Sequence, residues 1–326
     1  MKQTAFEKQH KASWQPFSEC VQALRKGEVR TQQLKHFAQD YRCICQHLAL
    51  AKQRGYSYPL IEELQQLALQ GHQQLYRHKS PVLQQLIGFV IIGFPATVRE
   101  QWRSVAVSAG LFFGSLALMA LLTFLFPNLI YSLISAAQVA NMESMYDPAN
   151  HLIGPMSTRD HQDDWVMFGF YILNNIGIAF QTFASGLLFG LGSLFFLLFN
   201  GLHIGAIAGH LTRIGYHETF WPFVIGHGAF ELTAIVLAGA AGLKLGAALL
   251  APGRFTRGEA LRQAAAVSIR LLGGATIFLV IAAFIEAYWS SSSSLSILTK
   301  VSVGCTLWAL VLGYLICSGR GQHAPD

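Results

Sequence analysis

Long apolar segments dominate the chain beyond residue 104, whereas shorter amphipathic segments dominate its beginning. A helix that crosses a bilayer needs about 20 mostly apolar residues. Four segments of roughly this kind stand alone: residues 105–126, 222–250, 264–289 and 301–316. The apolar block 166–209 is too long for one span, and we divide it in two near Ser185-Gly186. The pattern therefore predicts an all-α polytopic membrane helix bundle of six transmembrane helices within residues 105–318.

The first eighty residues follow a different pattern. Apolar side chains recur three or four positions apart at Phe37, Tyr41, Ile44 and Leu48, and the pattern returns from Leu60 onward. This spacing places them on one face of a helix, so residues 1–80 are predicted to form a cytoplasmic domain of about three amphipathic helices.

Residues 81–104 join these two regions. The apolar run that begins at residue 82 is too short to span, because Phe94-Pro95 is expected to break it. Arg99 and Arg103 follow and would hold the segment at the headgroup level. We predict an interfacial elbow helix on the inner face of the membrane.

Composition and charge distribution support a membrane protein and orient it. The chain is 52% hydrophobic and only 12% charged, which excludes an ordinary soluble domain. Residues 1–104 hold 14 of the 23 basic and 7 of the 17 acidic residues, and the loop 251–263 carries three arginines. Because basic residues remain inside, we expect cytoplasmic termini, a cytoplasmic tail over residues 319–326 and an acidic outer loop over residues 127–165.

Few features point to cofactors or to redox chemistry. The five cysteines form neither a disulfide framework nor a pair with zinc-ligand spacing, so we interpret them as reduced thiols. The first hundred residues contain no signal-peptide pattern. We expect no cofactor, no metal site and no nucleic-acid partner; the expected partners are membrane lipid and either membrane proteins or further copies of the chain.

Polar residues inside the predicted spans form candidate layers. At 1.5 Å rise per residue, Asn175, Asn200 and Glu231 lie roughly 12–13 Å below the outer boundary, and His203 and His227 lie roughly 7 Å below it. Polar groups are costly in hydrocarbon and need partners. We therefore predict one intramembrane polar cluster, with these members: Asn174, Asn175, Asn200, His203, His227 and Glu231.

The pair His227 and Glu231 shares a helix face, because the two residues are four positions apart. Burial favours neutral Glu231, whereas a charged His227 would favour the carboxylate, and both states stay open. Glu286 lies near the end of the predicted span 264–289 and is expected to snorkel to the outer surface. Asp160, His161, Asp163 and Asp164 are interpreted as a solvated acidic loop rather than as metal ligands.

Small residues recur along the third and fourth spans. Glycines four positions apart let helix backbones approach closely. We predict tight packing of spans two, three and four around the polar cluster, through these glycines: Gly201, Gly205, Gly228, Gly242 and Gly246.

These motifs together resemble the stage II sporulation protein M family over roughly residues 85–318. The resemblance is carried by an ordered set of short motifs: Phe94-Pro95 with Arg99 and Arg103, Asn174-Asn175, Asn200-Gly201 with Gly205, and His227-Gly228-x-x-Glu231 followed by Ala-Gly-Leu-x-Leu-Gly. The amino-terminal helices resemble those of longer members from non-sporulating bacteria. The resemblance implies a bacterial inner-membrane protein. The namesake helps to localise a peptidoglycan-degrading complex during engulfment, but nothing in this sequence points to sporulation.

Three functions remain open at this level. We expect a non-enzymatic scaffold or assembly factor for an envelope-associated complex, in which the polar cluster joins helices. The first alternative is a transporter or channel for a small ion or proton, using the Asn, His and Glu residues. The second is an intramembrane metal-dependent hydrolase, in which a glutamate activates water beside His227 and His203.

Overall fold

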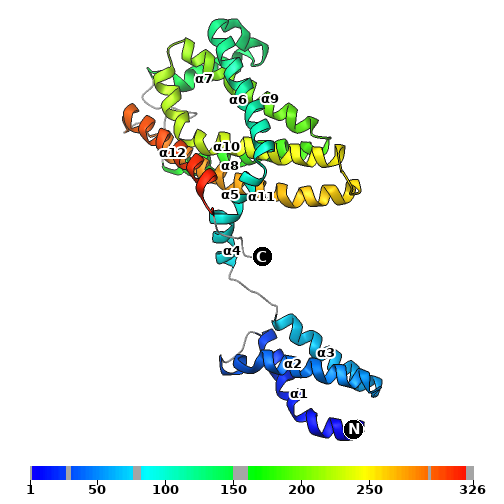
Figure 1. Ribbon diagram of the computed structural model, residues 1–326. Helices are drawn as coiled ribbons and strands as arrows, with labels where there is room; N and C mark the ends of the chain where they lie inside the picture. Colours follow the sequence, from blue (N-terminus) through cyan, green and yellow to red (C-terminus); the bar gives the residue numbers. More distant parts are fainter. Residues whose placement is uncertain (1, 27–30, 76–81, 150–160, 293–294, 321–326) are drawn as a thin grey trace. The chain divides into compact units, whose positions relative to one another are not determined.

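The chain forms two helical units. The computed structural model describes residues 2–26, 31–75, 82–149, 161–292 and 295–320. Within these ranges every regular element is a helix, which confirms the all-α prediction (Figure 1). The two units are Met1–Gln85 and Leu86–Asp326.

The first unit contains three helices, α1 (Gln3–Lys26), α2 (Thr31–Gln53) and α3 (Tyr58–Leu75). Gly55, in a left-handed conformation with φ of 61°, makes the turn between α2 and α3. The helices bury one apolar cluster that includes Phe6, Trp14, Phe17 and Leu64. The apolar positions that predicted amphipathic helices thus lie in the core of this unit, where Phe37 and Ile44 are buried.

The second unit is the membrane bundle. Its elements are α4 (Val82–Gly88), the π-helical η1 (Phe89–Gly93), α5 (Phe94–Glu100), α6 (Trp102–Leu125), η2 (Pro127–Ser132), α7 (Ala136–Tyr146), α8 (His161–Ala184), η3 (Ser185–Leu187), α9 (Leu191–Arg213), α10 (His217–Leu250), α11 (Arg257–Phe284), the π-helical η4 (Ile285–Ser290) and α12 (Ile297–Cys317). The predicted division at Ser185-Gly186 is confirmed by η3, a short 3₁₀ turn.

Seven described helices are long and apolar enough to cross a membrane. Six correspond to the predicted spans, and the seventh is Val82–Glu100, the predicted elbow. The expectation that Phe94-Pro95 breaks this helix is wrong. The widened turn of η1 lets Phe94 N–H donate to the carbonyl of Phe89, and Pro95, which has no N–H, falls in the first turn of α5. The helix bends at Gln101 instead, where φ is −96° and ψ is 21°.

Helix α10 is the centre of the bundle. It contacts α6, α8, α9, α11 and α12. Of its most apolar 18-residue window, 67% is buried, against 22% for α6, α12 and the Val82–Glu100 helix. Figure 1 shows α10 and α11 side by side over most of their length. The outer helices therefore leave most of their apolar surface uncovered by the rest of the chain, whereas α10 packs against other helices.

Glycines bring backbones into direct contact in two places. A methyl group at Gly201 or Gly205 of α9 would overlap the backbone of α6 at Phe112 or Leu116. A methyl group at Gly242 of α10 would overlap Ser193 of α9 and the carbonyl of Phe183 near the end of α8. A methyl group at Gly246 would overlap the backbone of the segment that joins α8 to α9, where Gly190 has a φ of 83°. The predicted stripe of α9 therefore packs on the first span α6, not on spans two and four as expected.

Hydroxyl groups supply further links to α10. Ser108 Oγ of α6 donates to the carbonyl of Val236 at 2.7 Å, and Ser268 Oγ of α11 donates to the carbonyl of Ala241 at 2.9 Å. Such interhelical hydrogen bonds are each worth about 1 kcal/mol in membranes. Small buried hydroxyls thus join α10 to α6 and to α11.

The predicted outer loop contains structure. Its described part holds η2 and α7, and Ser135 begins α7 with a reciprocal capping box to Gln138. Residues 150–160, including Asp160, lie outside the described residues, as do the side chains of His161, Asp163 and Asp164.

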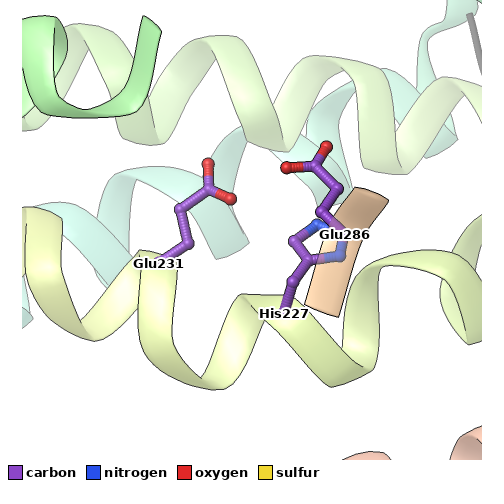
Figure 2. A group of neighbouring side chains, drawn as sticks. All are labelled: His227, Glu231 and Glu286. Atoms are coloured by element: carbon purple, nitrogen blue, oxygen red, sulfur yellow. The ribbon is translucent and has the colours of Figure 1, made fainter. Parts of the chain in front are cut away.

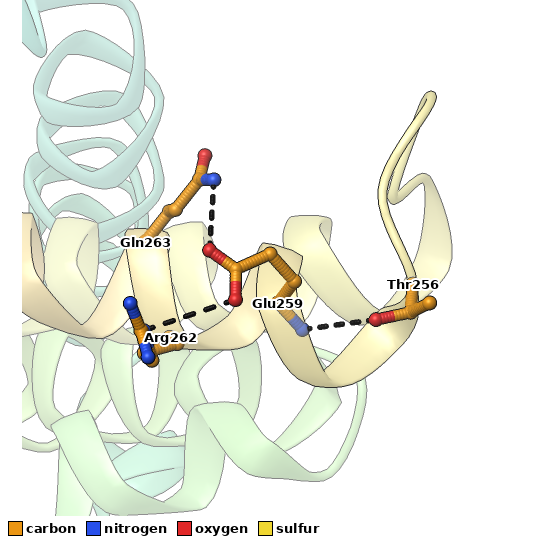
Figure 3. Close-up of polar contacts among 4 residues, drawn as sticks. All are labelled: Thr256, Glu259, Arg262 and Gln263. Carbon is orange, nitrogen blue, oxygen red and sulfur yellow. Dashed lines mark hydrogen bonds and ion pairs between the residues drawn. The ribbon is translucent and has the colours of Figure 1, made fainter.

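A capped turn joins α10 to α11. Thr256 Oγ1 accepts a hydrogen bond from the backbone N–H of Glu259 at 3.3 Å (Figure 3). The Glu259 carboxylate accepts from Gln263 Nε2 at 3.1 Å and lies 3.8 Å from Arg262 Nε. The cap satisfies a free N–H at the start of α11, whereas the exposed Arg262 pair adds little.

We expect Gly205→Ala to lower the free energy of unfolding by about 1–3 kcal/mol, because its methyl group overlaps the carbonyl of Leu116. The matched control is Gly114→Ala on α6, where a methyl group would meet nothing within 4 Å. Thermal unfolding of both purified variants in one detergent measures the difference. Equal melting temperatures would contradict the close α6–α9 contact.

Candidate functional site

Three ionisable side chains meet inside the bundle. His227 and Glu231 lie one turn apart on α10, and Glu286 comes from η4. One nitrogen or oxygen atom from each lies within 4.8 Å of the others. Figure 2 shows the three side chains extending from their two helices into the same space. The i, i+4 spacing on α10 brings His227 and Glu231 together. The sequence alone does not show that the carboxylate of Glu286, from η4, lies beside them.

The π-helical segment η4 determines how Glu286 points. One oxygen of its carboxylate is buried, so the expectation that Glu286 snorkels to the surface is wrong. A π-helical turn inserts an extra residue into the helical repeat and re-aims the side chains that follow. Glu286 consequently points into the bundle, toward α10.

The same segment holds His227 in place. Ser290 Oγ lies 3.2 Å from His227 Nδ1, and the backbone carbonyl of Ser290 accepts a hydrogen bond from Lys300 Nζ at 2.8 Å. Lys300, on α12, is only 4% exposed. A chain of polar contacts thus runs from α12 through η4 to the imidazole of α10.

A cavity of about 190 Å³ opens beside the cluster. Helices α7, α9 and α10 line it; Glu231, His227 and Gly228 lie on its α10 wall, and Tyr146 of α7 faces them. Thr219 Oγ1 donates to the carbonyl of Tyr146 at 2.5 Å and fixes the end of α7. Most of the remaining lining is apolar.

The pKa of the Tyr146 phenol is shifted by burial and by nearby ionisable groups. Burial raises the pKa of its phenol, and the nearby Glu286, Tyr171 and Glu231 raise it further. The phenol is therefore neutral at physiological pH and keeps its proton beside both carboxylates. It can donate that proton in a hydrogen bond to an acceptor in the cavity.

The other predicted cluster members have local partners. Asn174 Nδ2 donates to Asn175 Oδ1 at 3.0 Å, and Asn175 is buried. Asn200 Nδ2 donates to the carbonyl of Phe196 in its own helix at 2.7 Å. The ring of His203 stacks on Phe199, also in its own helix. The structure thus brings His227 and Glu231 together with Glu286, and these contacts of the other four residues do not reach that group.

Four of the five predicted glycines pack tightly against neighbouring segments. Gly228 differs from the other four glycines, since a methyl group there would meet only Val224 and Leu232 of its own helix, at 3.5 Å or more. It opens onto the cavity instead.

At the elbow, Phe94 and Pro95 are buried, with Phe94 edge-on against Phe278. Arg99 Nη1 donates to the carbonyl of Leu315 at 3.0 Å, whereas the guanidinium of Arg103 lies over the Trp102 ring. Arg99 therefore ties α5 to the end of α12, and Arg103 stays at the surface.

Comparison with known proteins now gives the family. A family model described as stage II sporulation protein M matches residues 104–291. The chain belongs to the stage II sporulation protein M family. A second model, described as a domain of unknown function, matches residues 4–77.

One curated relative matches part of the chain. An uncharacterized protein of Methanocaldococcus jannaschii is 28% identical over 75 residues, which make up 23% of this chain and 42% of the relative. The chain thus spans less than half the length of the curated relative that it matches. No solved structure matches the chain.

The segment that matches the family model includes the candidate site apart from Lys300. Its members Tyr146, His227, Glu231, Glu286 and Ser290 all fall within residues 104–291. Sequence reasoning missed Glu286, although a signal was present. A carboxylate inside an apolar span is costly and needs a partner. Tyr146 gave no comparable signal, because it lies in the segment predicted as an outer loop.

Chemically, the site can do two things. An imidazole and two carboxylates are ligands for a divalent cation. Two carboxylates at this distance can also share a proton, because both do not ionise easily side by side in an apolar interior.

We expect Lys300→Met to lower the free energy of unfolding by about 1–3 kcal/mol, because it removes the ammonium donor from the buried Ser290 carbonyl and keeps the aliphatic stem. Thermal unfolding in detergent measures the loss, with the exposed Ser302→Ala on the same helix as the control. An unchanged melting temperature for Lys300→Met would show that this contact does not hold η4.

Proposed function

We propose that this protein is a scaffold or assembly factor for an envelope-associated complex in the bacterial inner membrane, with both termini in the cytoplasm. Family membership and the apolar helices support a multi-pass membrane protein. The excess of basic residues in the first unit and in the loop 251–263 supports the orientation.

The observation that carries the proposal is the direct backbone contact of α10 with the segment joining α8 to α9, and of α9 with α6. Transporters alternate by moving one group of helices against another around a site. Helices that touch through glycines, where a methyl group does not fit, have little room to slide. A bundle of this kind suits a fixed platform for partners.

The first unit offers a surface for such partners. It has its own apolar core. A groove of about 390 Å³ lies between α1 and α3, with Trp14 and Leu67 at its base and glutamines and charged side chains along its rim. We expect a protein partner to occupy this groove, since a buried aromatic surrounded by adaptable polar groups is typical of binding sites.

Passage of a proton or small cation is the second candidate function. The observation that favours it is the His227, Glu231 and Glu286 group beside its cavity. Ionisable residues within membrane spans commonly mark ion pathways or proton relays.

Flux measurement separates the two candidates. We expect full-length protein in liposomes to show no proton flux above that of empty liposomes, measured with an enclosed pH-sensitive dye under an imposed gradient. Conduction would instead give flux that Glu231→Gln abolishes, because the amide does not carry a proton. Flux that Glu231→Gln removes and that Glu259→Gln preserves would overturn the platform as the principal role.

The groove supplies the positive test. We expect Gln66→Arg, on the groove rim, to reduce recovery of the chain's native-membrane complex at least about tenfold, because each 1.4 kcal/mol lost from an interface weakens it by that factor. Mild-detergent native electrophoresis with mass spectrometry measures the complex. The control is Gln46→Arg on exposed α2 surface. Migration of the wild-type chain alone would contradict the scaffold, and equal loss in both variants would contradict the groove.

A further inference from the structure

We infer that His227, Glu231 and Glu286 bind one divalent transition-metal ion of the zinc class. The ligand set consists of one imidazole nitrogen and two carboxylate oxygens, from two helices that are adjacent in space and more than fifty positions apart in sequence. Imidazole favours zinc and its transition-metal neighbours over magnesium and calcium, which prefer oxygen ligands alone.

The spacing of the three side chains fits a single ion. Zinc lies about 2.0–2.2 Å from its nitrogen and oxygen ligands, so the ligand atoms around one ion lie within about 4 Å of one another. The three groups already lie within 4.8 Å. Rotations about the glutamate side-chain bonds would bring these atoms to the ligand distances of one ion. Figure 2 shows both carboxylates and the imidazole turned toward a common space.

An outer layer of contacts orients the histidine. Its Nδ1 is engaged by Ser290 Oγ at 3.2 Å, which leaves Nε2 as the ring nitrogen for an ion. Ser290 is fixed in turn, because its carbonyl accepts the Lys300 ammonium. Metal-binding histidines usually donate their other ring N–H to a polar group that sets the ring's orientation. The contacts from Lys300 through Ser290 to His227 are an arrangement of this kind.

Charge balance gives a second, independent argument. Two carboxylates inside an apolar bundle are costly unless a positive charge compensates them. Among the described residues, no donor hydrogen-bonds the carboxylate of Glu231, which lines the cavity. The ammonium of Lys300 is directed to the carbonyl of Ser290. A divalent ion between Glu231 and Glu286 neutralises both charges at once.

The cavity supplies the remaining coordination position. Three protein ligands leave a tetrahedral ion one open site, which water or a small anionic group fills. Gly228, without a side chain, keeps this side clear, and the phenol of Tyr146 faces it. A ligand on the ion would therefore have room, and Tyr146 would donate a hydrogen bond to it. This inference stands whether or not the platform role is correct, because binding of the ion is measured without any partner.

Metal analysis and titration of the full-length protein test the inference. We expect detergent-purified protein, stripped with chelator, to bind one Zn²⁺ per chain in calorimetry, and Co²⁺ at the same site to give visible absorption bands of a nitrogen and oxygen environment. Glu231→Gln and Glu286→Gln should each remove this binding. Ser290→Ala should weaken it about 10–100-fold, as expected for loss of a residue that orients a ligand.

The matched control is Glu259→Gln, a carboxylate at the start of α11 that contacts Arg262 and Gln263 (Figure 3). It should bind Zn²⁺ as the wild type does. Size-exclusion profiles and melting temperatures check that each variant is folded. Wild-type protein that binds no Zn²⁺ or Co²⁺ would overturn the inference and leave two carboxylates that share a proton. Unchanged binding in both cluster variants would overturn it as well.

Discussion

At Gly242 and Gly246, helix α10 approaches its neighbours so closely that no side chain fits. In lipid, apolar side chains gain nothing by moving from acyl chains to one another, so close van der Waals contact must replace the hydrophobic effect. Gly242 provides that contact with the end of α8 and with α9, Gly246 provides it with the segment between them, and Gly201 and Gly205 provide it between α9 and α6. These contacts hold α6, α8, α9 and α10 together, and 67% of the apolar window of α10 is buried among its neighbours.

Burial of α10 makes its polar residues energetically costly and also gathers them into a site. His227 and Glu231 lie on a helix that is surrounded by protein, so their charges do not reach lipid or bulk water easily. The π-helical turn η4 brings Glu286 and Ser290 to them, and α7 closes the outer side with Tyr146. A rigid bundle with one small polar chamber is thus consistent with a fixed platform whose chamber holds an ion.

Some of this arrangement could be read from local pattern. The spans, the division at Ser185-Gly186 and the periodicity of the amino-terminal core follow from side-chain chemistry within about twenty residues, which is the length scale of one helix. The pairing of His227 with Glu231 is likewise local. The continuity of the helix through Phe94-Pro95 could not be predicted in this way, because it depends on a π-helical turn at Phe89–Gly93 that composition does not reveal.

The sequence by itself determined that this is an all-helical membrane protein with a separate amino-terminal unit, because hydropathy and periodicity are properties of single segments. Only the tertiary structure decided that the α9 glycines face α6, that Glu286 points inward, and that Tyr146 of the outer segment joins the site. The physical reason is rotation. Each helix can turn any face toward any neighbour until backbone contact, a π-helical turn or a buried hydrogen bond selects one orientation.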